Sequence, residues 1–549
     1  MDFQRVFLFL IFTFSAYILW DGWQKLQNPV IESSRVASTP VASTALLNNS
    51  INANSQTLKS DSFVSNKQED IKGETVIVKT DFLLAEINTV GGDITRIELL
   101  KHFDTADKSK SFVLFENNKA HKYVAQSGLL GTDLPTHNTV YSAQSNNYQL
   151  LDNKDALEVR LISKNKSGIN VSKIFIFHKS SYLIDVNFEI DNSSQSKLET
   201  SAYYQLVRDN IEPTGASMFV PTYTGPAIYT EKDKFKKIDF SSIAKNNAGL
   251  PPHADNGWAG MLQHYFVSAW IPKGNTPREF YAKELDNKYY AIGLILPVTA
   301  IEAGKTGSIS VPLYVGPAQS KLDSIAEGLG LTVDYGFLTI IAKPIFWLLT
   351  AIHGWVQNWG VAIILLTVLI KLAFFPLSAA SYRSMAKMRL VAPKLAKIKE
   401  QHSGDRERLN KAMMELYKTE KINPLGGCLP VLIQIPVFIS LYWSILSSVE
   451  MRYAPFFGWI TDLSKADPYF ILPVIMGVTM LIQTKLNPIP PDPMQAKLMQ
   501  IMPIAFSVIF FFFPAGLVLY SVVNNVLSIL QQWYITRNIE AAAKGVAKV

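Results

Sequence analysis

The sequence predicts a polytopic α-helical membrane protein with six spans, a large all-β sandwich domain and a cytoplasmic helical hairpin. Hydrophobic residues make up 48% of the 549 residues and charged residues only 18%, as expected when a soluble part is averaged with a membrane part. Residues 74–331 alternate apolar and polar side chains between turn signals, which is typical of strands. Beyond residue 356 most of the chain consists of long apolar segments, which favour membrane helices.

The N-terminal segment is expected to anchor the chain in a membrane. Apolar residues 6–20 follow Arg5, and Trp20 and Trp23 stand at the boundary, where aromatic side chains favour the membrane surface. A cleaved signal peptide is the alternative for so short a segment, but no small-x-small cleavage site follows it. We therefore expect an anchor over residues 1–27. Residues 28–73, rich in Ser, Asn, Thr and Ala, predict a flexible tether.

Residues 74–331 predict one β-sandwich domain. Four segments show the pattern of alternating, β-branched strands well: residues 75–80, 157–162, 173–177 and 182–188. Gly-Gly, Lys-Ser-Gly and Asn-Ser-Ser turn signals separate such segments. Regular short strands of this kind favour a large antiparallel sandwich with its own core.

Five further apolar segments follow the β region, near residues 356–382, 425–446, 469–486, 496–513 and 515–535. Together with the N-terminal anchor they give six spans, five of them in a core over residues 356–535. Residues 332–355 are also apolar at helical spacing but carry Lys343 and Pro344. If this segment crossed the membrane with the β region outside, it would export the basic loop that follows the second span. We therefore expect an interfacial amphipathic helix.

The charge pattern gives the orientation. Residues 383–421 contain eleven Lys and Arg against five Asp and Glu, and the positive-inside rule places such a loop in the cytoplasm. Both termini, including a tail over residues 536–549, then lie in the cytoplasm and the β domain lies outside. The loop has two sets of apolar residues at helical spacing, which predict a hairpin with a narrow apolar seam: Val391, Leu395 and Ile398, then Leu409, Met413 and Leu416. It either only fixes topology or also docks anionic lipid, ribosomal RNA or a protein.

Lys371 is the most informative single residue, because it stands inside an otherwise apolar run. A cation at the centre of a membrane helix costs about 3 kcal/mol on insertion scales, so it needs water or a partner. No Asp or Glu lies inside any other apolar segment. The sequence therefore predicts that water reaches Lys371, or that its partner comes from another molecule.

Other polar residues inside the apolar segments are candidates to share a site with Lys371. The polar residues chosen are Thr367, Gln434, Tyr520, Ser521 and Asn524, and Asn525 and Ser528 continue the series on the last span. Taken singly, each side chain is explained by a hydrogen bond between helices. Taken together with a cation, they predict a cavity with one wet face, in a bundle that its prolines bend and loosen.

No enzyme signature accounts for the chain. The sequence has no Walker loop, no G-x-S-x-G and no H-E-x-x-H. Ser384 and Lys387 match S-x-x-K, but the same spacing recurs at unrelated places, so it carries no weight. One cysteine excludes an internal disulfide, and the eight histidines include no pair at metal-ligand spacing. We expect no catalysis, no metal and no cofactor.

Several strings are signatures of a known family. They are LTVDYG at residues 331–336, NPLGGCLP at 423–430, QIPVF at 434–438, FPAGLVLY at 513–520, GWAGMLQHYF at 257–266 and AWIP at 269–272. The chain resembles the YidC/Oxa1/Alb3 family of membrane protein insertases in its Gram-negative YidC form. The resemblance follows the same order along nearly the whole chain and leaves only residues 28–73 without a signature.

This resemblance implies an inner-membrane insertase and chaperone, acting alone or with the Sec translocon and its accessory subunits on nascent inner-membrane proteins. The ribosome and anionic lipids are further partners it suggests. It implies a hydrophilic groove whose cation, here Lys371, attracts acidic residues in the translocating tail of a substrate. The nascent span would slide along the third and fifth spans, at positions that include Cys428, Pro430, Met502 and Phe506. The β domain is expected to lie in the periplasm and to resemble sugar mutarotases.

The sequence departs from the family pattern at one residue and leaves two alternative functions open. The family's groove cation is commonly Arg, and a desolvated Lys loses its proton more readily, so this chain depends more on a hydrated groove. A membrane-anchored, periplasmic carbohydrate-binding or carbohydrate-active protein is the first alternative, since Trp258, Tyr265 and Trp270 could stack on sugar, although core packing explains them equally. A transporter is the second, although the spans do not form two equivalent halves.

Overall fold

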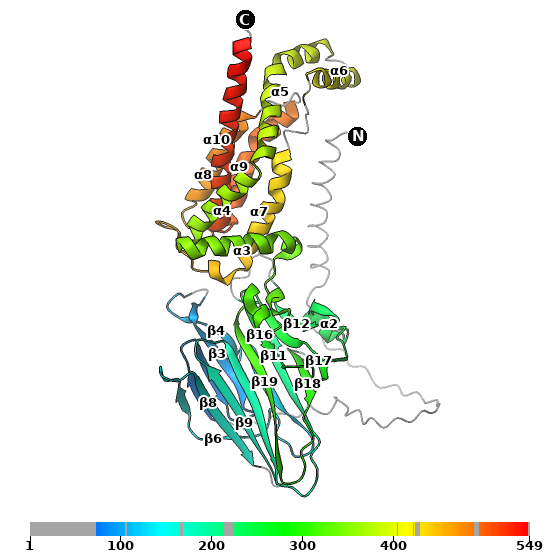
Figure 1. Cartoon of the computed structure of the whole chain (residues 1–549), viewed down its shortest axis with the longest axis vertical. Helices are drawn as coiled ribbons and strands as arrows, with labels where there is room; N and C mark the ends of the chain where they lie inside the picture. The colour runs from blue at the N-terminus through cyan, green and yellow to red at the C-terminus, as the bar shows by residue number, and fades with distance from the viewer. Residues whose placement is uncertain are drawn as a thin grey trace, which may run out of the picture. The chain divides into compact units, whose positions relative to one another are not determined.

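The structure is a computed structural model (Figure 1), and it describes residues 73–104, 107–164, 168–213, 223–286, 288–402, 405–420, 422, 429–487 and 493–546. The expected anchor over residues 1–27 and the tether over residues 28–73 lie outside this range, apart from residue 73 itself. Cys428 is also outside it.

Two antiparallel-dominated sheets form the β domain. The ten-stranded sheet runs in the order β14 (His253–Ala254), β17 (Arg278–Leu285), β18 (Tyr289–Pro297), β11 (Ser201–Asp209), β5 (Lys122–Leu130), β4 (Ser111–Asn117), β3 (Asp93–Phe103), β2 (Leu83–Asn88), β1 (Thr75–Lys79) and β7 (Asn147–Gln149). The nine-stranded sheet runs in the order β13 (Lys234–Lys237), β12 (Gly225–Thr230), β15 (Trp258–Gln263), β16 (Phe266–Trp270), β19 (Lys305–Pro317), β10 (Leu183–Asn192), β9 (Ile169–His178), β8 (Ala156–Lys164) and β6 (Ser142–Ala143). A short helix, α2 (Phe240–Ala244), follows β13.

Alternation along the strands builds the core between the sheets. In β10 every second residue is fully buried, namely Ile184, Val186, Phe188 and Ile190, while the residues between them are more exposed. β10 pairs antiparallel with β19 along its whole length and with β9 over residues 184–192, which fixes this register. The predicted β-sandwich is therefore confirmed.

The aromatic residues considered for sugar stacking belong to packed surfaces instead. Trp258 and Trp270 are each only 1% exposed and contribute to the hydrophobic clusters, and Tyr265 packs against one of them. Burial of this kind favours the core interpretation of these side chains over a sugar-stacking one.

The C-terminal part of the chain is helical. After three 3-10 turns (Ser320–Ser324, Leu329–Thr332 and Gly336–Leu338) come α3 (Thr339–Val356), α4 (Trp359–Ala373), α5 (Phe375–Gln401), α6 (Arg406–Thr419), α7 (Leu429–Ser447), α8 (Ile471–Leu486), α9 (Pro493–Ile509) and α10 (Ala515–Val546), with further 3-10 turns at Val449–Met451 and Phe510–Phe512. α10 packs against α4, α5, α7 and α8, and α8 also packs against α9. α3 contacts α4 and α7 and runs crosswise to the long helices in Figure 1.

The second apolar segment is not the single helix that residues 356–382 predicted. α4 ends at Ala373, α5 begins at Phe375, and the two axes differ by 67°. Pro376 stands in the first turn of α5, where its missing N–H is tolerated, but it cannot continue α4 because its ring clashes with the preceding turn. The basic segment then forms the rest of α5 and, after a break near residue 402, α6.

Length and composition alone single out few membrane helices among the described residues. α3 is long and apolar enough to cross a membrane, and so is the bent pair α4 and α5 when it is taken as one span. Residues 433–447, 471–486 and 497–512 form shorter apolar helices of 10–17 residues. This count does not reproduce the six spans expected from the sequence, and it includes α3, which the charge pattern placed at the interface.

Candidate functional site

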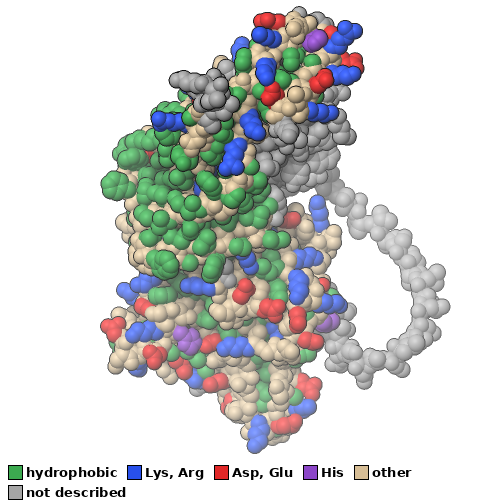
Figure 2. Space-filling view, turned by 45° about the horizontal axis from the view of Figure 1, so that its top comes forward, with side chains coloured by type: hydrophobic (Ala, Val, Ile, Leu, Met, Phe, Trp, Pro, Cys, Tyr) green, Lys and Arg blue, Asp and Glu red, His purple; other side chains and the backbone are tan. Residues whose placement is uncertain are grey.

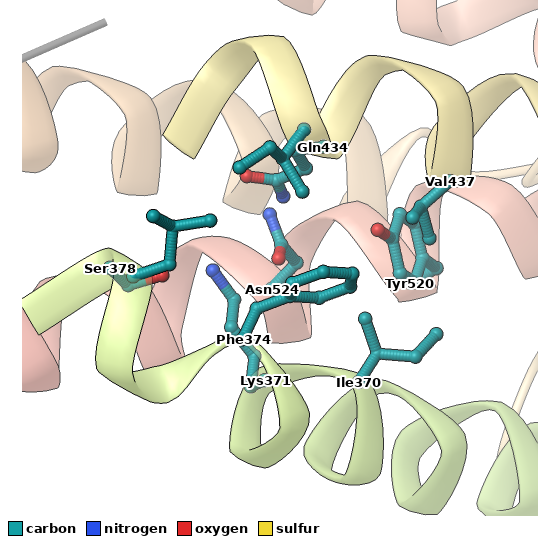
Figure 3. A pocket seen from close by; sticks show the side chains of 10 residues that line it. Ile370, Lys371, Phe374, Ser378, Gln434, Val437, Tyr520 and Asn524 are labelled. Atoms are coloured by element: carbon teal, nitrogen blue, oxygen red, sulfur yellow. The ribbon is translucent and has the colours of Figure 1, made fainter. Parts of the chain in front are cut away.

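A small cavity lies between α4, α5, α7 and α10. Its lining residues are Ile370, Lys371, Phe374, Leu377, Ser378, Ile433, Gln434, Val437, Tyr520 and Asn524. The cavity volume is about 30 Å³, which exceeds the roughly 10–15 Å³ that one water molecule needs. Figure 3 shows the polar ends of Lys371, Gln434 and Asn524 directed toward one another from three different helices.

The break after α4 decides where Lys371 lies. Asn358 caps the start of α4 by accepting a 3.0 Å hydrogen bond from the Val361 N–H, and Lys371 falls in the last turn of the helix. The sequence suggested an uninterrupted span around Lys371, whereas the structure places this residue in the last turn of a helix.

The Lys371 ammonium group has a neutral partner. Its Nζ donates a 2.6 Å hydrogen bond to Oγ of Ser528 on α10, and Ser528 is only 2% exposed. No Asp or Glu lines the cavity, and in the described part of the chain Lys371 forms no ion pair. The positive charge is therefore hydrogen-bonded but not neutralised within this chain.

Three of the five predicted polar neighbours line the cavity together with Lys371, namely Gln434, Tyr520 and Asn524. The other two, Thr367 and Ser521, do not. The Thr367 hydroxyl donates to the Ile363 carbonyl at 2.6 Å, and the Ser521 hydroxyl donates to the Leu517 carbonyl at 2.9 Å. Short hydroxyl side chains commonly bond the carbonyl one turn earlier in their own helix, so the single proton of each of these hydroxyl groups is used within its own helix.

Two polar residues at this site were outside the predicted set of site residues. Ser378 lines the cavity from α5, and Ser528 binds Lys371 from α10. Ser528 continues the series of polar residues that begins at Tyr520, so its spacing was a usable signal. Ser378 lies beyond the break between α4 and α5, so its position relative to Lys371 could not be read from helical spacing.

The candidate slide residues are only partly described. Met502 and Phe506 are one turn apart on α9 and are 37% and 42% exposed, so they lie on the outer surface of the helical region. Pro430 belongs to α7, but the position of its side chain is not described, and Cys428 lies outside the described residues.

The outer surface of the helices is apolar. Leu365, Leu369 and Leu372 of α4 are 40–61% exposed, and apolar residues of α8 and α9 are exposed in the same way. Figure 2 shows hydrophobic side chains gathered over much of the visible face of the helical region, with charged side chains of both signs at its top end. Extensive exposed apolar surface of this kind marks contact with lipid or with apolar partners.

No group of His, Cys, Asp and Glu suited to a metal ion occurs among the residues that the structure describes. The site therefore offers one cation, amide and hydroxyl groups, and room for water. It can attract an anion and hydrogen-bond a polar chain.

Two family models match the chain, one described as the YidC periplasmic domain over residues 75–348 and one as 60Kd inner membrane protein over residues 351–542. The membrane protein insertase YidC of Nitrosospira multiformis is 54% identical over 100% of this chain and 99% of that protein. The chain belongs to the YidC family of membrane protein insertases.

Another YidC insertase, from Methylobacillus flagellatus, is 53% identical over 99% of this chain and 98% of its own length. A crystal structure described as an active YidC insertase with its first transmembrane domain resolved is 18% identical, covers 84% of this chain and 95% of its own, and gives a TM-score of 0.39. The expected function is confirmed by the relatives: the chain is an inner-membrane protein insertase with a periplasmic β-sandwich domain, and its relatives are named as insertases rather than enzymes.

Proposed function

We propose that the cavity around Lys371 is the inner end of a hydrophilic groove that receives acidic residues of a substrate's translocating tail. The observation that carries this proposal is the un-neutralised ammonium group among amide and hydroxyl side chains contributed by separate helices. An acidic residue entering the groove would supply the counter-charge that the described chain lacks. Gln434, Tyr520 and Asn524 would hydrogen-bond the polar backbone of the tail.

A wet groove explains how insertion proceeds without a nucleotide site. A polar tail crossing about 30 Å of hydrocarbon needs every polar group satisfied along its path. A hydrated hollow that reaches partway into the membrane shortens the dry part of that path. The following apolar span then moves into lipid along α9, past Met502 and Phe506, and past α7 near Cys428 and Pro430. Burial of that span in hydrocarbon supplies the driving force.

The proposed topology has six spans: the N-terminal anchor, the α4 segment with the first part of α5, then α7, α8, α9 and α10. α3 lies in the interface rather than across the membrane. Its buried residues, Ala342, Phe346, Leu349 and Ile352, fall on one face, while Trp347 and Trp355 are 71% and 90% exposed. The crosswise course of α3 in Figure 1 supports the same assignment, and exposed Trp is typical of membrane interfaces.

Under this topology the hairpin of α5 and α6, with boundaries near residues 383–421, projects into the cytoplasm together with both termini. The β domain over residues 74–331 lies in the periplasm. The basic surface of the hairpin would attract anionic lipid or the ribosome. The Sec translocon and its accessory subunits are the partners we propose for larger substrates, following the family resemblance.

Charge substitution at Lys371 tests the groove. Lys371→Arg should retain insertion of a small two-span substrate with an acidic tail, because the charge is preserved. Lys371→Glu should reduce it by about tenfold or more, since an attraction worth a few kcal/mol becomes a repulsion. The measurement is the amount of substrate inserted into vesicles, compared between the substrate with the acidic tail and the same substrate with each Asp of the tail changed to Asn. Lys485→Glu, the same reversal at an exposed site on α8, is the matched control. Equal insertion of the acidic tail by Lys371→Glu and Lys485→Glu would refute the groove proposal.

Site-specific labelling tests the topology. A single cysteine at Lys411 on α6 should react with a membrane-impermeant reagent only from the cytoplasmic side, and one at Lys154 in the β domain only from the periplasmic side. Both positions are exposed, so a cysteine that does not react with reagent added on one side must lie on the other side of the membrane. Reaction of both cysteines from the same side would contradict the six-span arrangement.

A further inference from the structure

We propose that Ser528 is the positioning residue for Lys371: it holds the ammonium group at one place in the cavity wall until a substrate carboxylate replaces it. This inference rests on the proposed groove function and adds a specific residue to it. Ser528 would thereby determine where along a translocating tail an acidic residue is recognised.

The hydrogen-bond geometry supports a holding role. The Ser528 hydroxyl accepts from Lys371 Nζ at 2.6 Å and donates to the Asn524 carbonyl at 2.7 Å. A hydroxyl group has one proton to donate, so with that proton committed to Asn524 its lone pairs face Lys371. The bond ties α4 to α10, the helix against which both α4 and α5 pack.

Lysine needs such a partner more than arginine would. Its ammonium group is a compact point charge on a flexible four-carbon stem, whereas a guanidinium group is rigid and forked. Lys371 is one turn from the break after Ala373, so a free side chain could swing toward the end of α4 and leave the cavity. The bond to Ser528 restricts that motion.

The partner also has to be replaceable. A neutral hydroxyl leaves the full positive charge of Lys371 in place, and a carboxylate forms a stronger, charge-assisted hydrogen bond with an ammonium group. An arriving Asp or Glu therefore displaces Ser528 at little cost. An acidic residue at position 528 would instead occupy Lys371 permanently.

The chain offers a matched control for this role. Ser521 lies seven residues earlier on α10, is 4% exposed, and also bonds the carbonyl four residues before it. It shares the helix, the burial and the backbone bond of Ser528, but the described hydrogen bond of Lys371 goes to Ser528 and not to Ser521. Both Ser521→Ala and Ser528→Ala remove a buried hydroxyl group from α10, but only Ser528→Ala also removes the contact to Lys371.

The experiment uses the full-length protein in vesicles and a set of substrates that carry one Asp at successive positions of an otherwise neutral tail. In the unmodified protein, insertion should peak at one Asp position. Ser528→Ala should flatten this peak by about tenfold, the effect expected when a hydrogen bond to a charged group is lost. Ser528→Thr, which keeps the hydroxyl, should restore the peak, and Ser521→Ala should leave it unchanged. The all-neutral tail, inserted equally by every variant, reports that the protein is folded.

The outcomes separate this inference from the function beneath it. A clear peak that Ser528→Ala leaves in place would overturn the positioning role while leaving the groove intact. No dependence on Asp in the unmodified protein would overturn the groove proposal itself. A uniform fall at all positions, the neutral tail included, would show that Ser528 only supports the fold, and would equally overturn its positioning role.

Discussion

Lys173 and Asp93 place ionisable groups inside the β-sandwich, at positions where strand alternation alone predicts apolar side chains. Lys173 is 1% exposed, and its Nζ donates to the carbonyls of Gly91 at 2.9 Å and Ser127 at 3.1 Å. Asp93 is 7% exposed and accepts a 2.6 Å hydrogen bond from the Gln126 side chain. Lys173 belongs to β9, whereas Gly91 immediately precedes β3 and Ser127 lies in β5, so this cation joins the two sheets.

Burial moves the pKa values of both groups toward neutrality. Desolvation raises the pKa of Asp93 from 3.8 to about 7, and the nearby charge of Lys173 opposes that rise. Desolvation lowers the pKa of Lys173 from 10.5 to about 8, and Asp93 opposes that fall. Between pH 3.8 and about 7 the folded domain keeps a proton on Asp93 that the unfolded chain has released. Its contribution to stability therefore decreases as pH rises through this window.

Asp93→Asn should remove this pH dependence. We expect the free energy of unfolding of the β domain to decrease from about pH 4 to pH 7 in the unmodified protein, and to change much less in the variant. Hydrogen exchange of the β5 amides, measured in the full chain from pH 4 to pH 7, reports this change in stability close to Asp93. Asp107→Asn, at a carboxylate whose side chain is 46% exposed, is the control and should keep the slope. An unaltered slope in Asp93→Asn would assign the effect to another group.

At the scale of elements, the connection between α7 and α8 packs against the β domain through one arginine. The guanidinium carbon of Arg452 lies 5.1–5.7 Å from the centres of four aromatic rings, those of Phe112, Tyr265, Phe266 and Tyr453. Tyr453 also donates a hydrogen bond to the Asp104 carbonyl. Burial lowers the pKa of the neighbouring His102 to about 4, and the charge of Arg452 adds to that effect, so His102 is neutral beside the cation.

Arg452→Met should loosen this contact without creating a large void, since the two side chains have similar length. Each cation–π contact is worth about 0.5–1 kcal/mol at accessible sites. We therefore expect faster hydrogen exchange in residues 448–455 and 103–112, with exchange in β9 and β10 unchanged. Arg452→Lys, which keeps a charge but not the flat guanidinium, should give an intermediate rate. Exchange that rises throughout the β domain would indicate unfolding instead of a local release.

At the scale of the whole molecule, the β-sandwich could be predicted from the sequence, because every second side chain of a strand faces the core and is therefore apolar. The sequence could not reveal the break after α4, because apolar residues continue through Phe374 and Phe375 and only Pro376 marks the change. It placed Gln434, Tyr520 and Asn524 near Lys371, since polar groups in apolar helices tend to face one another. It could not separate them from Thr367 and Ser521, whose hydroxyl groups bond their own helices.

The sequence strings shared with the family also contain residues whose identity is explained only by the folded structure. Gly257, which begins one of them, has a φ of +105°, and a Cβ there would lie 1.9 Å from the Tyr229 carbonyl oxygen. Only glycine fits such a position. Spacing in the sequence shows that a glycine is present, whereas the close approach to β12 depends on the folded domain.

Water access at Lys371 is the central claim, and a neighbouring pair of residues measures it directly. Ile370 lines the cavity, whereas Leu369 beside it is 44% exposed on the apolar outer surface. In a chain with Cys428→Ser, a cysteine at Ile370 should react with a membrane-impermeant maleimide added from the cytoplasmic side, because maleimides need a thiolate in water. A cysteine at Leu369 should stay unreacted in lipid. Equal failure of both cysteines to react would show a dry, closed interior and contradict the groove.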